Sequence, residues 1–276
     1  MSDTSPLLAV IVVNTNTRNW LEPCLNSLEE QEIFESLEVV VVDNDSTDGS
    51  ADMVRRNFPA CKLVQLDKNV GFGPANNIGV QHSTAPLLLF LNPDTIVYEN
   101  SLPAILLRFE EHPRCGVAGG IIFDGDGELE RSVGSFPSLF SMGLDRLLRY
   151  LPPARPILGR LSHQHWAGYD EPYSVNWVTG AYLWIRREVF EEVGGFDKHI
   201  FVYCEDVDLC YRVWQLGFEC WFFPEGPIVH YRGKAPMPRP RKKMLCENLL
   251  YFANKHYRSP KFWLTRSVFW IMSRLY

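Results

Sequence analysis

The chain lacks the marks of several common protein classes. Its seven cysteines are odd in number and form no Cys-x-x-Cys pair, which argues against a disulfide framework and against a zinc site of that spacing. It contains neither the Gly-x-Gly-x-x-Gly of a dinucleotide-binding fold nor the Gly-Lys-Ser/Thr of a phosphate-binding loop. Residues 1–6 have no basic start, so we expect no signal peptide and a cytoplasmic protein with reduced thiols.

Length and charge narrow the class further. A chain of 276 residues, 46% of them hydrophobic, is long enough for one large α/β domain or for one domain with an appendage. The net charge of −6 gives no reason to expect a nucleic-acid partner. The charge is also uneven, because residues 232–276 contain eleven Lys and Arg against one acid, which leaves −16 for residues 1–231.

Two apolar segments each end in a cluster of polar and acidic residues. Residues 37–42 precede Asp43-Asn44-Asp45-Ser46, and residues 86–91 precede Asn92-Pro93-Asp94-Thr95. Short apolar runs of this kind are typical of strands buried on both faces of a parallel sheet. Ligands of open α/β sheets bind outside the carboxyl ends of the strands, so these carboxylates predict a nucleotide or divalent-cation site. The alternative is that the aspartates only cap helices or close turns.

A third acidic cluster opens a predicted helix. Over residues 205–216, Leu209, Val213 and Leu216 recur at helical spacing, acids occupy the first turn, and Gly217 follows as a stop. Upstream lie an apolar segment, residues 175–185, and a tight turn that includes Gly194-Gly195-Phe196-Asp197. Downstream, residues 219–231 predict a strand, a Pro-Gly turn and a second strand that carries His230.

The order of these motifs carries a family resemblance. Besides the three acidic clusters, the series contains Val12-Val13-Asn14, the segment from Asn69 to Gly79, Thr179-Gly180-Ala181, the Gly194 turn and Val229-His230. It resembles the inverting nucleotide-sugar glycosyltransferases of family 2, and most of all the branch that includes bacterial rhamnosyltransferases. The resemblance covers about residues 7–232. It implies a GT-A fold, an α/β fold whose mostly parallel central sheet is flanked by helices.

The resemblance also implies a domain division and a set of site residues. A nucleotide-binding half, about residues 1–100, and an acceptor half, about residues 101–232, are followed by a basic loop and a helical tail at 233–276. Asp206 matches the catalytic base, with Glu205 beside it as a second catalytic residue and Asp208 as a further candidate. Asp94 and His230 match the ligands of Mg²⁺ or Mn²⁺, while Asn92 stands where the broader family often has the first acid of Asp-x-Asp. The expected nucleotide-sugar contacts are Asn14, Asp43, Asn44, Gly71, Asn77, Asn92 and Asp94, and the expected acceptor contacts are Trp177, Thr179 and Gly180.

The function expected from this resemblance is sugar transfer from a nucleotide diphosphate to a hydroxyl of a glycan, one that is linked to a polyprenyl diphosphate. The favoured donor is dTDP-L-rhamnose, and UDP-hexoses are the alternative. A sugar nucleotidyltransferase would share the nucleotide-binding sheet, but the chain has Asn14-Thr15-Asn16-Thr17-Arg18 where the signature Gly-x-Gly-Thr-Arg is expected. A non-catalytic scaffold is disfavoured because Asp206, Asp94 and His230 are all retained.

The basic C-terminal region predicts a membrane contact. Residues 233–243 are rich in proline and basic residues, which is typical of a mobile loop, and residues 262–276 interleave Trp and Phe with Arg. That composition fits an amphipathic helix attracted to anionic lipid, although it is too short and too charged to span a bilayer. We therefore expect a peripheral protein on the inner face of the cell membrane. The alternative is a helix packed back on the domain.

Overall fold

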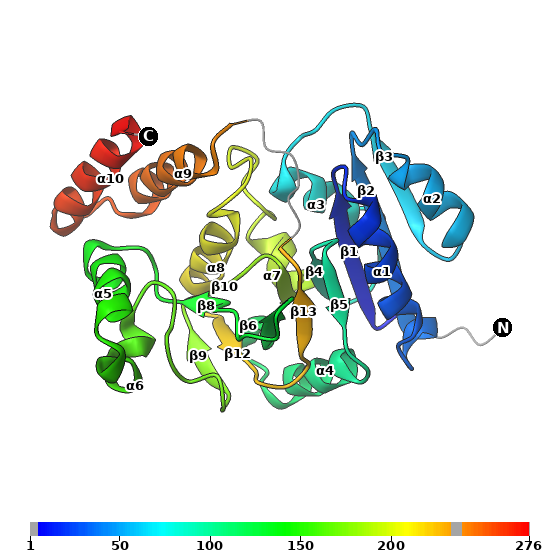
Figure 1. Ribbon diagram of the computed structural model, residues 1–276, viewed down its shortest axis with the longest axis horizontal. Coiled ribbons are helices and arrows are strands. Elements are labelled where there is room, and N and C mark those ends of the chain that lie inside the picture. The colour runs from blue at the N-terminus through cyan, green and yellow to red at the C-terminus, as the bar shows by residue number, and fades with distance from the viewer. Residues whose placement is uncertain (1–4, 233–238, 276) are drawn as a thin grey trace.

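The computed structural model describes residues 5–232 and 239–275, apart from the side chain of Lys261. An eight-stranded sheet runs through the molecule in the order β3-β2-β1-β4-β11-β6-β12-β9 (Figure 1). Its strands are β1 (Leu8–Asn14), β2 (Leu37–Asn44), β3 (Lys62–Leu66), β4 (Leu87–Leu91), β6 (Cys115–Gly119), β9 (Tyr173–Val175), β11 (Tyr182–Arg186) and β12 (Glu219–Phe222). The first four strands in this order pair in parallel, β11 is antiparallel to both of its neighbours, β12 runs parallel to β6, and β9 is antiparallel to β12.

The apolar runs form buried strands for the expected reason. Every residue of β1 is buried, and alternate side chains enter two separate cores on opposite faces of the sheet. Ile11 and Val13 face the core that includes Ala75 of α3 (Phe72–Val80), whereas Val10 faces the core that includes Leu21 of α1 (Arg18–Glu29). The sheet is therefore covered on both faces, and its polar strand ends remain to form a site.

The remaining helices cover the rest of the sheet and the C-terminal side of the molecule (Figure 1). They are α2 (Ser50–Asn57), α4 (Ser101–Glu111), α5 (Leu139–Tyr150), α6 (Arg155–Leu158), α7 (Arg187–Glu192), α8 (Glu205–Gln215), α9 (Arg241–His256) and α10 (Trp263–Leu275). Short 3₁₀ turns occupy Phe34–Ser36, Pro152–Ala154, Gly159–Leu161 and Pro260–Phe262. The predicted helix at residues 205–216 is α8.

Two small sheets complete the fold. One pairs β8 (Val133–Gly134) with β10 (Trp177–Val178), and the other has the order β5-β13-β7. In the second, β13 (Ile228–His230) lies between β5 (Thr95–Val97) and β7 (Ile122–Asp124), with His230 opposite Thr95 and Asp124. This register brings the end of the predicted strand-turn-strand unit next to the Asn92–Asp94 turn.

The C-terminal region differs from the expected loop and tail. Residues 233–238 of the predicted loop lie outside the described residues, whereas Arg241, Lys242 and Lys243 form the first turn of α9. The loop prediction was wrong for these three residues, because α9 buries Phe252 and other apolar side chains in the same core as α8. The predicted C-terminal helix is α10, which packs against α9 and α5. No helix in the described part of the chain is both long and apolar enough to cross a membrane.

Candidate active site

A buried polar network closes the carboxyl ends of β1 and β2. The Asn14 side-chain amide donates to Asp43 Oδ2 at 3.3 Å and to Ser50 Oγ at 2.7 Å, and the Ser46 amide donates to Asp43 Oδ1 at 3.0 Å. Both Asn14 and Asp43 are almost fully buried. A carboxylate has about four acceptor positions. These two donors leave acceptor positions of Asp43 open, so a further hydrogen bond, such as one from a base N–H, can still be accepted.

The last residue of β2, Asn44, also holds the glycine-rich segment. Asn44 Oδ1 accepts from the Val70 amide at 2.9 Å, and its amide donates to Asn69 Oδ1 at 3.0 Å. Gly71 has a φ of +93°, and a Cβ at this position would lie 2.5 Å from the Phe201 carbonyl oxygen. Only glycine fits this approach. Asn44 and Gly71 are thus in the predicted place, where they shape the loop in front of the α8 segment.

Asn77 serves a different purpose from the one predicted. Its side chain donates to the Phe196 carbonyl and accepts from the Phe196 amide, both at 2.8 Å. These two bonds join α3 to the glycine turn before α8. Because both polar ends of the amide are used in this clamp, the structure does not support a nucleotide contact for Asn77.

The segment Thr179-Gly180-Ala181 links the second and third acidic clusters. The Gly180 amide donates to Asp206 Oδ2 at 3.0 Å, and the next carbonyl, that of Ala181, accepts from the Asn92 amide at 3.0 Å. The Asp206 carboxylate also accepts from the Val207 amide at 2.8 Å. These contacts place the predicted base at the start of α8, beside the turn that carries Asp94.

Glu205 and Asp206 form a pair of carboxylates in a desolvated setting. Burial raises the pKa of Asp206, and the two backbone amides oppose that rise in part. Burial and the neighbouring Asp206 charge raise the pKa of Glu205 well above its usual value, and Glu205 Oε2 is buried without a hydrogen-bond partner. Burial thus raises the pKa of both carboxyl groups, and only Asp206 accepts from backbone amides of neighbouring residues, which favour its ionised form.

Asp208, in contrast, is a structural residue. It is fully buried and accepts from Arg212, from Lys255 Nζ at 2.8 Å and from His256 Nε2 at 2.7 Å. Burial alone would raise its pKa, but these partners hold the pKa below its usual value. Because all its contacts are to cationic or ring N–H groups, Asp208 is not available as a base, and it ties α8 to α9.

A second contact from α9 holds the backbone just before the catalytic pair. Tyr203 and Cys204 both have positive φ values, of 68° and 75°, which non-glycine residues rarely adopt. The Asn248 side chain on α9 donates to the carbonyls of Val202 and Tyr203, at 2.8 and 3.1 Å. The C-terminal helix thus supports the conformation that directs Glu205 and Asp206. Sequence reasoning missed this role, since neither Asn248 nor Lys255 belongs to a recognisable motif.

His230 lies between two carboxylates. Its Nε2 is 3.4 Å from Asp94 Oδ1 and 3.3 Å from the Asn92 side-chain amide, while its Nδ1 is 3.0 Å from Glu130 Oε2. Burial would lower the pKa of His230, but the two carboxylates outweigh it and raise the pKa to about 9. Glu130, which also pairs with Arg232 at 3.3 Å, was not predicted. It lies in an acidic turn that matches no motif.

The donor set fits a divalent ion that the substrate helps to hold. Within the described residues, no group of three or more His, Cys, Asp and Glu side chains is arranged to bind a metal. Asp94 Oδ1 and His230 Nε2 lie close enough together to bind the same ion once the imidazole has released its proton. Mg²⁺ is commonly held by one or two carboxylates together with substrate phosphates and water. A two-residue site at Asp94 and His230 is therefore compatible with a nucleotide diphosphate that completes the coordination.

The predicted acceptor residues separate into two groups. Thr179 and Gly180 lie next to Asp206, as the hydrogen bond from the Gly180 amide shows. Trp177 is buried in the core, and its indole N–H donates to the Ser135 carbonyl at 3.0 Å. The structure therefore does not support an acceptor contact for Trp177, because its ring packs inside the domain and its only polar atom has a partner.

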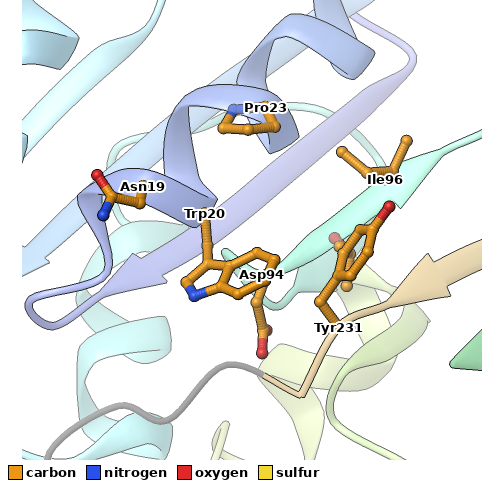
Figure 2. Close-up of a pocket in the computed structure, with 7 residues that line it drawn as sticks. Asn19, Trp20, Pro23, Asp94, Ile96 and Tyr231 are labelled. Carbon is orange, nitrogen blue, oxygen red and sulfur yellow. The ribbon is translucent and has the colours of Figure 1, made fainter. Parts of the chain in front are cut away.

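A cavity of about 300 Å³ lies on the other side of the Asp94 turn. Figure 2 shows the rings of Trp20 and Tyr231 side by side next to Asp94, with Pro23 and Ile96 on the walls. The two ring centroids are 5.1 Å apart. The cavity joins the start of α1 to the residue after His230, and its lining includes neither Asp43 nor Asp206.

Comparison of the sequence with known protein families identifies the family of this chain. The model of the family described as Glycosyl transferase family 2 matches residues 9–194, which include the first two acidic clusters and the Thr179 segment. The chain belongs to glycosyl transferase family 2. It is a glycosyltransferase, as predicted, and the relatives it matches include rhamnosyltransferases, the predicted branch.

Several relatives of the chain are rhamnosyltransferases. The chain is 28% identical to the N-acetylglucosaminyl-diphospho-decaprenol L-rhamnosyltransferase of Mycobacterium tuberculosis over 286 residues, which cover 98% of this chain and 92% of the relative. It is 24% identical to the dTDP-rhamnosyl transferase RfbF of Shigella flexneri, with 83% and 70% of the two chains covered. A rhamnosyltransferase of Escherichia coli, WbbL, is 28% identical over 58% of this chain and 61% of its own length.

Solved structures confirm the GT-A fold. The mannosyltransferase PcManGT from Pyrobaculum calidifontis, in complex with GDP-mannose and Mn²⁺, has a TM-score of 0.62 at 20% identity, with 99% of this chain and 70% of that chain covered. GalNAc-T7, in complex with UDP, GalNAc and Mn²⁺, has a TM-score of 0.67 at 17% identity, with coverages of 94% and 50%. At these identities the likeness extends to the fold alone.

Proposed function

We propose that this glycosyltransferase moves L-rhamnose from dTDP-L-rhamnose to a hydroxyl group of a lipid-linked glycan, with inversion at the anomeric carbon. The observation that carries the proposal is the position of Asp206. Gly180 and Ala181 connect its carboxylate to the Asn92–Asp94 turn, so a base and a diphosphate-binding turn lie on either side of one short segment. A single displacement at the anomeric carbon needs these two groups together.

In the proposed reaction the acceptor oxygen forms a bond to the anomeric carbon while the bond from that carbon to the diphosphate oxygen breaks. The hydroxyl proton passes to Asp206, and the nucleoside diphosphate leaves with the electron pair of the broken bond. Mg²⁺ or Mn²⁺ bound at Asp94 and His230 would neutralise charge on the departing diphosphate. Glu130 orients the imidazole of His230, and Asp43 accepts from the base of the nucleotide.

The choice of donor and acceptor is supported by the relatives. The names of the mycobacterial and Shigella relatives specify rhamnosyl transfer, and the mycobacterial name specifies a diphospho-decaprenol acceptor. The runner-up is a UDP-hexose donor, because two structures of similar fold, GalNAc-T7 and S. aureus TarS, were solved with UDP and with UDP-GlcNAc. A lipid-linked acceptor also agrees with a peripheral position on the membrane, on the inner face, through the basic C-terminal region.

The test is a donor panel with one acceptor. The full-length protein is incubated with Mn²⁺, a synthetic GlcNAc-diphospho-prenol and each of dTDP-L-rhamnose, UDP-glucose, UDP-GlcNAc and GDP-mannose. We expect acceptor-dependent release of dTDP and a product heavier by one deoxyhexose. Release of UDP instead would replace the donor assignment, and turnover only on a glycan without the lipid diphosphate would replace the acceptor assignment. Asp206→Asn protein serves as the control for release that does not depend on catalysis.

A further inference from the structure

Exposed apolar side chains are concentrated on one part of the molecule. Of the twenty large apolar residues that are exposed in the described part of the chain, eleven lie in two short segments, residues 139–161 and 263–275. They are Phe140, Leu147, Tyr150, Leu151, Ile157 and Leu161 in the first segment, and Trp263, Leu264, Trp270, Ile271 and Leu275 in the second. These segments make up about an eighth of the chain, so the concentration is well above an even spread.

The two segments adjoin in space although more than a hundred residues separate them. α5 and α10 are in contact, and Figure 1 shows both at the end of the molecule opposite the N-terminal half of the sheet, with α6 beside α5. We call the exposed side chains of residues 139–161 and 263–275 the α5–α10 face. The prediction from sequence included only its C-terminal part.

Each helix presents its apolar residues as a stripe. On α10, Trp263 and Trp270 are one heptad apart, as are Leu264 and Ile271, whereas Phe269 is buried toward the domain. On α5, Phe140, Leu147 and Tyr150 lie at positions i, i+7 and i+10, while Leu144 and Leu148 are buried. Both helices are therefore anchored by one side and carry exposed apolar groups on another, which is the arrangement of an interfacial helix.

The charge of the same segments is strongly positive. Residues 139–161 contain four arginines and a single acid, Asp145, which is buried and paired with Arg131 and Arg149. Residues 263–275 contain two arginines and no acid. Together the two segments carry +5, whereas the rest of the chain carries −11. An isologous contact with a second copy would place +5 against +5, which disfavours that occupant.

We propose that the α5–α10 face docks on an anionic lipid bilayer, with α5 and the α6 segment contributing as much as α10. Tryptophan and tyrosine suit the boundary between headgroups and acyl chains. The exposed arginines Arg146 and Arg274 would meet lipid phosphates. The proposal deepens the proposed lipid-linked acceptor, because a surface-bound enzyme meets such an acceptor at the bilayer. Vesicle binding is measured without donor or acceptor, so its outcome and that of the transfer assay are independent.

The experiment compares cosedimentation of full-length variants with vesicles of phosphatidylglycerol and phosphatidylcholine. Trp270→Ser/Ile271→Ser tests α10, and Phe140→Ser/Tyr150→Ser tests α5. Leu107→Ser on α4, where the residue is 54% exposed, is the matched control for loss of an exposed apolar side chain. We expect each double variant to lower the partition coefficient about tenfold. The four changes together should lower it about a hundredfold, because separate sites act additively. The control should bind like wild type.

Other results would overturn the inference. If the α5 variant bound vesicles as well as wild type, α5 would not belong to the docking face. If wild-type protein bound pure phosphatidylcholine as well as the anionic vesicles, the basic residues would have no role in docking. A dimer in light scattering that the α5 and α10 variants convert to a monomer, with vesicle binding unchanged, would assign the face to a second copy of the chain. Unchanged melting temperatures of the variants, which alter only exposed side chains, show that lost binding is not lost folding.

Discussion

At the scale of single residues, the catalytic pair predicts different effects for two similar substitutions. Asp206→Asn removes the ionised carboxylate next to Gly180, so turnover should fall by about 10²–10⁴ while affinity for dTDP stays the same. Glu205→Gln should be milder, because burial raises the pKa of Glu205 and so favours its neutral form, which glutamine resembles. Steady-state kinetics and dTDP titration measure both effects. A larger loss in Glu205→Gln than in Asp206→Asn would exchange the two roles.

The catalytic pair also predicts how kcat/KM changes with pH on the acidic side of the profile. A base acts only when it is ionised, so kcat/KM should rise with pH through the pKa of Asp206. Burial raises that pKa, which places the limb above the usual aspartate value of about 3.9. The measurement is kcat/KM against pH at saturating metal, within the range where the protein stays folded by circular dichroism. A rate independent of pH down to the usual value would argue against a buried base.

The diphosphate side of the site gives a separate prediction. EDTA should abolish transfer, Mn²⁺ or Mg²⁺ should restore it, and Asp94→Ala should weaken binding of dTDP far more than binding of thymidine. Glu130→Gln should raise the Mn²⁺ concentration needed for half-maximal stabilisation of the dTDP complex by about tenfold or more, because Glu130 orients His230. Thermal shift measures this without turnover, with the exposed Glu128→Gln as control. Full activity in EDTA would remove the metal role.

Sequence alone identified the residues that lie in linear motifs and missed those that act across the fold. Asp206, Asp94 and His230 belong to ordered motifs, and the structure brings their segments together. Glu130 and Lys255 were missed because their roles depend on contacts with residues 100 and 47 positions away. Asn77 and Trp177 were assigned to ligands because polar and aromatic residues near a site suggest binding. Which way a side chain faces, however, is decided by packing.

At the scale of elements, α9 is a support for the catalytic helix. Lys255 bridges Asp197 at 2.6 Å and Asp208 at 2.8 Å, and Asp208 is fully buried. Lys255→Met should destabilise the protein by about 1.5–3 kcal/mol, because Asp197 and Asp208 each lose a charge-assisted hydrogen bond while keeping their other partners. Turnover should fall as well, since α8 carries Asp206. The exposed Lys198→Met is the matched control, and urea unfolding with kinetics in parallel tests both effects. Equal stability of the two variants would contradict this role.

This loss of stability should depend on pH with a definite sign. Burial would raise the pKa of Asp197 and of Asp208, but Lys255 and the other hydrogen-bond partners hold both below their usual values. Groups of this kind stabilise the fold above the pKa of the unfolded chain, about 3.9, and lose that contribution as the pH falls through their lower folded values. The difference between wild type and Lys255→Met should therefore be largest at neutral pH and shrink below about pH 4.

The elements themselves were predicted best where the periodicity was strong. The strands at residues 37–42 and 86–91 and the helix at 205–216 were found because their cores are apolar and their ends carry turn residues or acids. The start of α9 was not found, since Arg241-Lys242-Lys243 has the composition of a solvated loop and joins a helix only because Met244 and Phe252 are buried further along. α10 was found as a helix. Its buried Phe269 shows that it is part of the domain surface, so single substitutions test it better than truncation.

At the scale of the whole molecule, the charge separation defines an orientation. The segments of the α5–α10 face carry +5 and the remainder carries −11, so an anionic bilayer attracts one end of the molecule and repels the other. The sequence showed that the basic residues accumulate toward the C-terminus. It did not show that residues 139–161 join them, because that depends on the contact between α5 and α10.

This orientation predicts how salt acts on activity. Salt shortens the distance over which charges interact from about 10 Å at 0.1 M to about 3 Å at 1 M. It therefore weakens the attraction between basic residues and anionic lipid headgroups, which is worth about 1 kcal/mol per residue near the surface. With a lipid-linked acceptor in anionic vesicles, added salt should raise the apparent KM for the acceptor and leave kcat unchanged. With a short soluble acceptor, or with the lipid-linked acceptor in neutral vesicles, the same salt series should have little effect. Equal salt sensitivity on all three acceptors would place the effect in the nucleotide site, where the diphosphate binds, instead of on the docking face.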